Sequence, residues 1–324
     1  MNDREGQKTK LHEIASAVRG QLGKESVVTF EDGIWDPVEA ISTGSVALDR
    51  ALGVGGFPRG RIVELLGSES SGKSSICLST IVQAQRQGLI CAYIDAENAF
   101  NPTWAGLLGV DVSFLLMSQE NCTENVFALV DKFIEQGVNV IVIDSVAGLA
   151  PKAEIEGDVG DFTVGLRARL MSQALSRLAS KLNKINTLMI FINQIRMQIG
   201  VMFGNPETTP GGKALKFYSS VRLDVRDGGK IKEGEDIIGI KIRINVVKNK
   251  VASPFKKAEA DFYFDRGFDN ELAYFDVAAE LGIFRKNGAY FEFEGENKHR
   301  AEWCTIIKED PSVLKRVVGA INGV

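Results

Sequence analysis

The chain has 324 residues, 44% of them hydrophobic and 25% charged, which is the composition of an ordinary globular protein with one large core and room for a smaller domain. Its net charge of −4 argues against a surface that is covered all over with nucleic acid. The sequence has no apolar run of about eighteen residues and no charged-then-apolar leader. We therefore expect a cytoplasmic protein without a membrane span or a signal peptide.

Cysteine and histidine usage excludes several kinds of site. The four cysteines, Cys77, Cys91, Cys122 and Cys304, are widely spaced and form no C-x-x-C pair, so buried reduced thiols are expected rather than disulfides or a zinc site. The two histidines lie near the ends of the chain. Any general base in the core must therefore be a carboxylate.

Positive charge is concentrated in the second half of the chain. Between Arg167 and Lys257 the sequence holds 18 Lys or Arg and 6 Asp or Glu, a local charge of +12. Such a bias marks either the solvated basic faces of ordinary helices and strands or a surface that binds a polyanion such as nucleic acid. Composition alone leaves both interpretations open.

The first predicted element is a helix over residues 11–23, where Leu11, Ile14, Val18 and Leu22 recur at three- and four-residue spacing. A helix of this length with one narrow apolar stripe is not stable alone in water. It is expected to dock either on its own domain or on another subunit.

A phosphate-binding loop follows a short apolar strand at Ile62–Leu66. The segment GSESSGKS, from Gly67 to Ser74, matches the pattern G-x-x-x-x-G-K-[ST], and a helix opens directly on it. Its glycines allow a tight turn whose backbone N–H groups point inward, where the helix dipole adds positive potential. Lys73 supplies a cation for the β- and γ-phosphates, and the Ser74 hydroxyl is the expected Mg²⁺ ligand. A chance glycine-serine loop would not have both flanking elements.

Two further predicted strands end in acidic residues. The strand Ile90–Ile94 leads to Glu97, and the strand Val138–Ile143 leads to Asp144. Ligands of open α/β sheets bind at this end of parallel strands. Glu97 is the candidate general base for an attacking water, or else a helix-capping or ion-paired acid, and Asp144 is expected to hold Mg²⁺, usually through water.

Two irregular segments flank the predicted helix Leu166–Leu182 and strand Leu188–Ile192. The first, Glu154–Gly165, is rich in glycine, and the second begins at Ile195 and runs for about fifteen residues without a regular pattern. The second mixes apolar residues with Arg196. This mixture suits a contact that unstacks nucleic-acid bases, and it also suits a lid packed on the core.

The remaining elements divide the chain into three parts. We predict residues 1–35 as an oligomerisation helix and linker, 36–269 as the main core, and 270–324 as a small terminal domain. The predicted strands are Ala214–Val225, Ile237–Val247 and Ala258–Phe264, and the terminal domain is read as a helix at Asn270–Phe284, a hairpin at 286–298 and a helix at Pro311–Ile321.

Six segments together strongly resemble the RecA family of bacterial DNA-dependent ATPases and recombinases, from about residue 36 to 265. The resemblance implies an α/β fold in which a RecA-type P-loop ATPase core has a largely parallel central sheet flanked by helices, with an N-terminal helix and a small α+β C-terminal domain. The segments are EAISTGSVALD, GRIVELLGSESSGKS, YIDAENAF, VIVIDSVAGLAPKAEIEG, FINQIRMQIGVMFGNPETTPGGKALKFYSSVRLD and VVKNKVASPFK.

The resemblance implies an ATP site with Mg²⁺ held by Ser74 and Asp144. The catalytic set that it implies comprises Lys73, Glu97 as the activator of water, Gln194 as the sensor of the γ-phosphate, and Lys248 and Lys250, which would reach the ATP of a neighbouring protomer. The residues implied to hold the nucleotide are Gly67, Ser68, Glu69, Ser70, Ser71, Gly72, Lys73, Ser74, Ser75, Asn101, Trp104, Asp144 and Phe264.

The same resemblance implies DNA-binding and subunit-interface residues. Segment 156–165 is similar to the family's first DNA loop and 195–209 to its second, while Arg226 and Arg243 would serve a weaker second DNA site. The remaining implied DNA contacts are Val164, Arg169, Ser172, Arg196, Met197, Ile199, Gly211 and Gly212, and the implied interface residues are Lys216, Phe217 and Arg222.

The function implied is ATP-dependent homologous recombination and DNA repair. The protein would form a filament on single-stranded DNA, search duplex DNA for homology and exchange strands, and it would also stimulate self-cleavage of a LexA-like repressor in the SOS response. Two alternatives use the same scaffold, namely a filamentous platform for repressor cleavage with little strand exchange, and a RecA-like motor such as a hexameric helicase.

Several positions depart from the family pattern. Val164, Ser176 and Asn245 replace the usual methionine and basic residues, which affects the expected details of DNA affinity. Asn101 and Trp104 stand where an aspartate and a tyrosine are usual, and Trp104 can still stack on a base. The sequence closes on Gly-Val without the acidic tail of many relatives, from which we expect weaker autoinhibition of duplex entry.

Overall fold

The computed structural model describes residues 2–24, 26–29, 31, 37–158, 165–197 and 207–323. They fall into two units, residues 1–38 and 39–324, each of which is described by itself. Among the residues that the structure describes, no helix combines the length and the apolar character that crossing a bilayer would take.

The N-terminal unit is built on helix α1 (Asn2–Leu22), which confirms the predicted helix and extends it toward the N-terminus. Glu31 accepts hydrogen bonds from Lys8 at 2.8 Å and pairs with His12 at 2.9 Å, so the chain beyond the helix returns to its side. Leu11 and Ile14 of the predicted stripe are more than half exposed.

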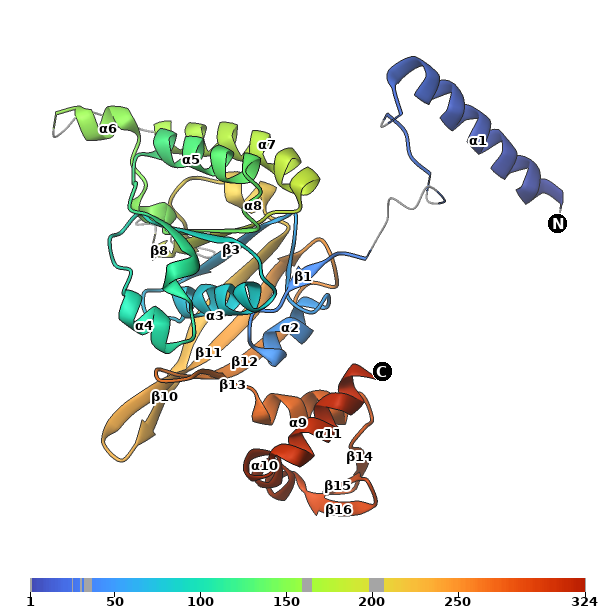
Figure 1. Cartoon of the computed structure of the whole chain (residues 1–324), viewed down its shortest axis with the longest axis vertical. Coiled ribbons are helices and arrows are strands. Elements are labelled where there is room, and N and C mark those ends of the chain that lie inside the picture. The colour runs from blue at the N-terminus through green and yellow to red at the C-terminus, as the bar shows by residue number, and fades with distance from the viewer. Residues whose placement is uncertain are drawn as a thin grey trace. The chain divides into compact units, whose positions relative to one another are not determined.

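A single mixed sheet forms the centre of the second unit (Figure 1). Within the described residues its nine strands run in the order β13-β12-β11-β10-β3-β7-β6-β4-β5, parallel from β10 to β5 and antiparallel from β10 to β13. In chain order these strands are β3 (Ile62–Gly67), β4 (Cys91–Asp95), β5 (Leu115–Ser118), β6 (Val140–Asp144), β7 (Leu188–Gln194), β10 (Val221–Glu233), β11 (Asp236–Asn249), β12 (Lys257–Tyr263) and β13 (Gly267–Asp269).

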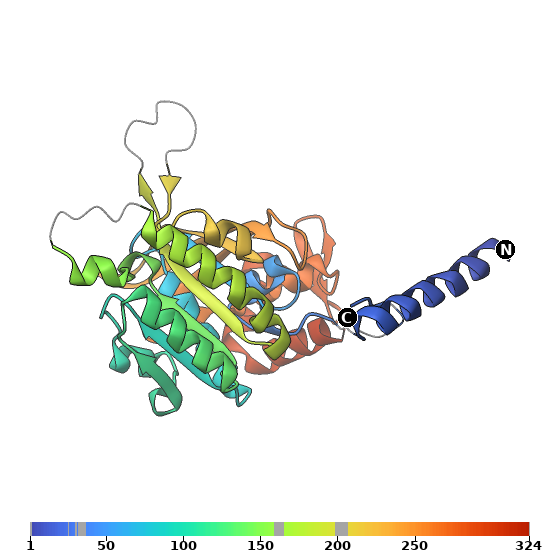
Figure 2. The ribbon, with the colours of Figure 1, turned by 90° about the horizontal axis from the view of Figure 1, so that it is seen from above.

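Helices cover both faces of the sheet, as expected for parallel strands that are apolar throughout (Figure 1). One face packs on α2 (Val46–Leu52) and α3 (Lys73–Arg86), and the other on α5 (Thr123–Glu135), α7 (Leu166–Ile185) and α8 (Ala214–Tyr218). Figure 2 shows α5 and α7, in green and yellow-green, lying side by side over the same face. The predicted α/β class with a largely parallel sheet is therefore confirmed.

Short elements connect this framework. They are β1 (Ala40–Ile41), β2 (Phe57–Pro58), α4 (Pro102–Leu107), α6 (Lys152–Glu156), β8 (Arg196–Met197), β9 (Glu207–Thr208) and the 3₁₀ turns Val112–Phe114 and Val146–Gly148. All four cysteines are free and buried, as predicted.

The C-terminal part has a core of its own. Helices α9 (Glu271–Glu280), α10 (Arg300–Glu309) and α11 (Pro311–Asn322) pack with the three-stranded sheet β14 (Arg285–Asn287), β15 (Tyr290–Phe293) and β16 (Glu296–His299). Its centre is aromatic: the Phe284 ring contacts those of Phe275, Phe293 and Trp303, and Phe293 also contacts Trp303. The small α+β domain is confirmed, and its boundary at residue 270 stays a prediction.

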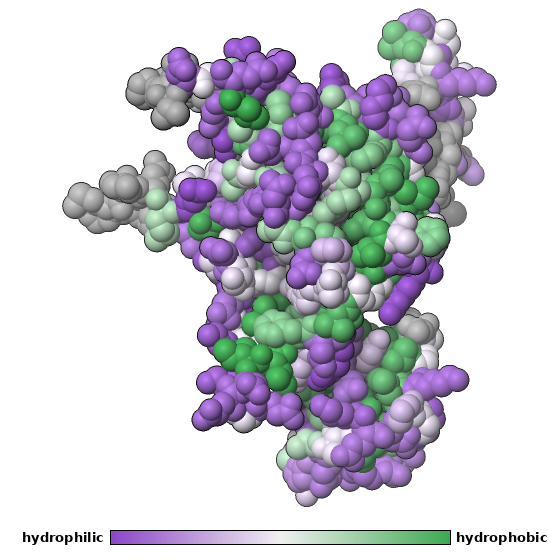
Figure 3. Space-filling view, turned by 60° about the vertical axis from the view of Figure 1, so that its left-hand side comes forward, coloured by the Kyte–Doolittle hydropathy of each residue, from purple (hydrophilic) through white to green (hydrophobic). Residues whose placement is uncertain are grey.

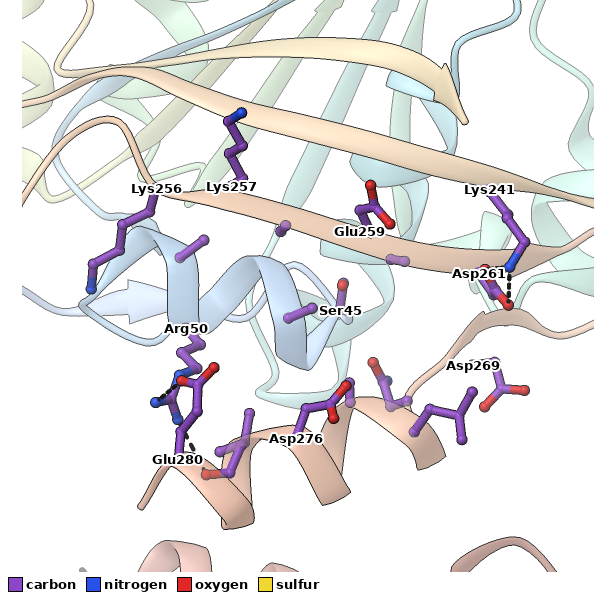
Figure 4. Close-up of a pocket in the computed structure, with 18 of the residues that line it drawn as sticks. Ser45, Arg50, Lys241, Lys256, Lys257, Glu259, Asp261, Asp269, Asp276 and Glu280 are labelled. Atoms are coloured by element: carbon purple, nitrogen blue, oxygen red, sulfur yellow. Dashed lines mark hydrogen bonds and ion pairs between the residues drawn. The ribbon is translucent and has the colours of Figure 1, made fainter. Parts of the chain in front are cut away.

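Side-chain contacts at α2 and just before it join this domain to the core. The side chain of Asn270 donates to the Gly44 carbonyl at 2.8 Å and accepts from the Val46 N–H at 2.9 Å. Figure 4 shows Arg50 of α2 and Glu280 of α9 meeting as an ion pair across the junction.

Several element predictions were wrong, including the hairpin at 286–298, where the structure has the three strands β14, β15 and β16. Residues 214–218 form helix α8 rather than the start of a strand, because Ala214 and Leu215 bury their side chains on the sheet in a helical turn, and β10 begins only at Val221. The segment 154–165 was read as irregular, whereas its first three residues complete helix α6, which begins after Pro151.

Candidate nucleotide and DNA site

The phosphate loop joins the end of β3 to the start of α3. A side chain at Gly67 would place its Cβ atom 2.1 Å from the Val225 carbonyl oxygen, so β10 leaves no room for one. Gly72 has a φ of +94°, a conformation that favours glycine, and a Cβ there would lie 2.4 Å from Ile242. Both glycines are therefore required for the loop to close against the sheet.

Lys73 turns its ammonium group into the loop. Its Nζ atom lies 3.2 Å from the Gly67 carbonyl oxygen and 3.4 Å from Ser71 Oγ, and it also donates to the Ser68 carbonyl. Burial lowers the pKa of Lys73, and the carboxylates of Asp144 and Glu97 raise it in part. A poorly solvated cation at the loop centre attracts phosphate strongly.

Ser74 and Asp144 form the pair that fits a hard divalent cation. The Ser74 hydroxyl donates to Asp144 Oδ2 at 2.7 Å, and the Tyr93 hydroxyl donates to the same oxygen at 2.5 Å. Burial raises the pKa of Asp144, and these two hydrogen bonds lower it in part. Mg²⁺ in nucleotide sites needs only one or two protein oxygens beside the phosphates, so the donor set suits that ion.

Glu97 lies next to Gln194, to which the family resemblance assigns the role of γ-phosphate sensor. Its Oε1 atom accepts a hydrogen bond from Gln194 Nε2 at 2.9 Å and another from the Ser145 hydroxyl. The N-cap of α4 is Asn101, so Glu97 is not a helix cap. Its carboxylate is exposed and has neutral hydrogen-bond partners, an arrangement that suits a base for water.

A cavity of about 140 Å³ opens beside these groups. It is lined by Ser74, Leu78, Tyr93, Asp95, Glu97, Ala99, Phe100, Asn101, Trp104 and Asp144. Trp104 also donates through Nε1 to the Phe264 carbonyl at 3.3 Å, which brings the predicted adenine-side residues together. A larger cleft of about 660 Å³ between α2, β12 and α9 has mixed charges and no phosphate-loop residue (Figure 4).

The described DNA candidates of the two loops lie on or near α7. Arg169 and Ser172 are exposed on that helix, and a Cβ at Gly212 would lie 2.7 Å from Ala168 Cβ, so the end of the second loop packs against the helix start. Gly211 likewise contacts Val146, which follows the Asp144 strand. Arg196 and Met197 are exposed on β8, while Val164 and Ile199 lie outside the described residues.

Arg226 and Arg243 face each other across β10 and β11. Arg226 makes two hydrogen bonds of 2.7 Å to Glu207 and one of 2.6 Å to Asp224, and these hydrogen bonds raise the pKa of Arg226. Arg243 is exposed and donates to the Asp227 carbonyl at 3.3 Å. Of the two, Arg226 already has its charge balanced within the chain.

The lysines predicted to act on a neighbour lie away from their own phosphate loop. Lys248 lies opposite Arg222 on β10, and Arg222 lies opposite Glu64 on β3. Gly67, where the phosphate loop begins, is three positions beyond Glu64, a rise of about 10 Å along the strand. The Lys248 Nζ atom donates to the Lys216 and Phe217 carbonyls at 2.7 and 3.1 Å. Three of the predicted interface residues therefore gather around one lysine.

Sequence reasoning missed Tyr93, Ser145 and Glu64. Tyr93 lies near the acidic end of β4, and Ser145 directly follows Asp144 at the end of β6. Their position beside acidic residues is the sequence signal that could have identified both. Glu64 is a charged residue inside a strand that is otherwise apolar or glycine, which is itself a signal of a buried polar contact.

Sequence similarity to known proteins extends over almost the whole chain. A family model described as the RecA N-terminal domain matches residues 9–269. Protein RecA of Ectopseudomonas oleovorans is 52% identical over 319 residues, covering 97% of this chain and 92% of that protein. Protein RecA of Halalkalibacterium halodurans is 48% identical over 325 residues, covering 99% and 92%, and that of Macrococcus caseolyticus is 49% identical over 310 residues, covering 95% and 88%.

Proposed function

This chain belongs to the RecA family of homologous-recombination and DNA-repair proteins, and from that membership we propose that it is a Mg²⁺-dependent, DNA-dependent ATPase that polymerises on single-stranded DNA. The observation that carries the proposal is the contact between Glu97 and Gln194 beside the phosphate loop. It joins the candidate base to the residue that leads into the second DNA segment.

Different side chains would bind the phosphates, hold Mg²⁺ and activate water during hydrolysis. The loop N–H groups and Lys73 bind the phosphates, and Ser74 and Asp144 would hold Mg²⁺, which neutralises charge on the β- and γ-phosphates when bound. Glu97 orients the attacking water and takes its proton. Trp104 stacks on the base.

Coupling to DNA follows from the position of Gln194 at the end of β7. A γ-phosphate competes for its amide with Glu97, and Arg196 and Met197 come two and three residues later. ATP binding therefore repositions the strand end that carries the DNA segment, in the manner of other phosphate-sensing switches.

Polymerisation would complete the active site. Lys248, at the end of β11, and Lys250, just after it, lie too far from their own phosphate loop to serve it and would supply cations to the ATP of the next protomer. The unit 39–324 exposes large apolar side chains that suit self-association, among them Phe114, Phe217 and Phe255. Figure 3 shows hydrophobic side chains gathered on the core, while the lower end, formed by the C-terminal domain, is mainly hydrophilic on this face.

The N-terminal unit has a use in the same filament. The exposed residues Leu11, Ile14 and Leu22 of α1 would pack on a neighbouring protomer. A LexA-like repressor as partner and a cytoplasmic location are proposed from the family membership alone.

The test is ATP hydrolysis measured without DNA, with single-stranded DNA and with duplex DNA. Single strands should stimulate turnover strongly at neutral pH, and electron microscopy should show helical filaments. DNA-independent turnover, or closed rings in place of filaments, would favour a RecA-like motor such as a hexameric helicase.

A further inference from the structure

A buried carboxylate in the middle of the sheet takes no part in the chemistry described so far. Glu64 of β3 is 0% exposed, and the rest of that strand is apolar or glycine. Burying a charge is unfavourable unless hydrogen-bonded or oppositely charged partners meet it. The partners of Glu64 therefore indicate its role.

Glu64 joins the strands on both sides of β3. Arg222 lies directly opposite it on β10, and the Arg222 Nε atom donates to Glu64 Oε2 at 2.5 Å. Asn193 lies on β7, two positions beyond the residue opposite Glu64, and its Nδ2 atom donates to Glu64 Oε1 at 3.0 Å. Side chains in such positions share one face of a sheet.

Asn193, Glu64 and Arg222 form a row of hydrogen-bonded side chains across three strands. The Asn193 end of this row adjoins both the proposed ATP sensor and the DNA segment. Gln194 is the next residue along β7, and Asn193 Nδ2 also lies 3.3 Å from the Pro210 carbonyl oxygen, directly before Gly211. Asn193 is 0% exposed, and its Oδ1 atom has no hydrogen-bond partner among the described residues. A buried amide oxygen without a partner among these residues is unfavourable, so we attribute the presence of asparagine to the hydrogen bonds that its Nδ2 group donates.

The Arg222 end of the row reaches the subunit face. Arg222 is in register with Lys248 on β11, and Lys248 holds the last carbonyls of α8 through Lys216 and Phe217. Burial lowers the pKa of Lys248, Lys250 and Arg222 lower it further, and Glu64 raises it in part. The Glu64 carboxylate therefore favours the charged form of Lys248, on the subunit face where the neighbour's ATP is expected.

We propose that Glu64 is a positioning residue that couples the ATP sensor and the DNA segment to the neighbour-facing lysine, through Asn193 on one side and Arg222 on the other. These residues lie on β7, β3, β10 and β11. A shift of β7 on ATP or DNA binding would reach Arg222 through two hydrogen bonds to one carboxylate, and Lys248 through the pairing of β10 with β11. This inference rests on the proposed function, because it takes Gln194 and Lys248 to act on ATP.

The test uses Glu64→Gln, Arg222→Gln and the double variant in the full chain. A glutamine at position 64 still accepts a hydrogen bond from Asn193 but loses the ion pair with Arg222. ATP affinity without DNA, read by titration, should stay within about two-fold of wild type. Stimulation of hydrolysis by single-stranded DNA should fall by about ten-fold or more in each single variant, and the double variant should be no worse than either.

Thermal unfolding of each variant is measured first, because the change removes a buried charge pair. If Glu64→Gln does not fold, the comparison of Arg222→Lys with Arg222→Gln decides, since lysine keeps a cation opposite Glu64 and should retain the stimulation that glutamine loses. Glu259→Gln, an exposed change on β12, is the matched control.

Three results would overturn the inference: full stimulation in Glu64→Gln, losses that multiply in the double variant, or equal activity of the two Arg222 variants. Failure of the proposed function is seen separately. In that case wild type itself shows no stimulation by DNA.

Discussion

Gln194 Nε2 lies 2.9 Å from Glu97 Oε1, and the two residues stand at the ends of parallel strands, at the same edge of the sheet. Glu97 adjoins the acidic end of β4, and Gln194 closes β7. The candidate base is therefore hydrogen-bonded to the residue that we propose as the γ-phosphate sensor. On the proposed mechanism a γ-phosphate would compete with Glu97 for the Gln194 amide, which would leave the Glu97 carboxylate available to water.

Replacing Glu97 with glutamine should stop hydrolysis without stopping assembly. The amide cannot take a proton from water, so the turnover rate on single-stranded DNA should fall by about 10²-fold to 10⁴-fold. ATP binding and filament formation should persist, because the phosphate loop and DNA segments are unchanged. Release of phosphate and electron microscopy measure the two properties. Glu259→Gln is the control, and a Glu97→Gln variant with wild-type turnover would assign the base to another residue.

Replacing Gln194 with alanine should separate ATP binding from DNA stimulation. Lys73, Ser74 and Asp144 stay in place, so ATP affinity should be near that of wild type. The ratio of DNA-stimulated to basal hydrolysis should fall toward one, because the link between phosphate and Arg196 is gone. The ratio is measured by titrating single-stranded DNA at saturating ATP. A variant that keeps the wild-type ratio would show that coupling takes another route.

Trp104 should report nucleotide binding by its fluorescence. It lines the nucleotide cavity, whereas Trp303 is buried in the C-terminal domain with its indole N–H bonded to Phe291. Stacking of adenine on Trp104 should change the emission in proportion to bound ATP. Trp104→Phe should lose the change while Trp303→Phe keeps it, and the opposite pattern would place the base elsewhere.

Asp49 should make stability depend on pH. Burial raises the pKa of Asp49 from 3.8 to about 6, although hydrogen bonds from Ser42 and Thr43 oppose the rise. Because the folded state binds the proton more tightly, the stability due to this group is fully present below pH 3.8 and is lost as the pH rises through about 6.

The difference in free energy of unfolding between wild type and Asp49→Asn isolates this effect from other titrations. Between pH 4 and pH 7 the free energy of unfolding of wild type should fall relative to that of Asp49→Asn by about 2 kcal/mol. Urea unfolding at a series of pH values gives the difference. A constant difference would mean that Asp49 titrates normally when folded.

The nucleotide half of the site could be predicted because its signals are local. A phosphate loop needs only eight consecutive residues, and Asp144 is marked by the apolar run before it. Parallel strands then bring their carboxyl ends to one edge, so Ser74, Glu97 and Asp144 meet as expected. The DNA and interface residues were named by family resemblance, and their roles stay predictions.

Other features could not be read from the sequence for physical reasons. Glu64 and Arg222 are separated by 158 positions, and their pairing depends on a parallel register that no local pattern specifies. The turn at 214–218 mixes strand and helix formers, so tertiary packing decides it. The pairing of Arg226 with Glu207 likewise depends on where β9 lies.

The most direct test of the shared active site mixes two inactive variants on single-stranded DNA with ATP. Glu97→Gln lacks the base but keeps Lys248, and Lys248→Ala lacks the cation but keeps Glu97. Each alone should be nearly inactive. In an equal mixture, random head-to-tail assembly places a complete pair at about one interface in four, so hydrolysis should recover to about a quarter of the wild-type rate. Recovery would show that each site is built by two protomers, and a mixture no more active than its separate components would contradict that account.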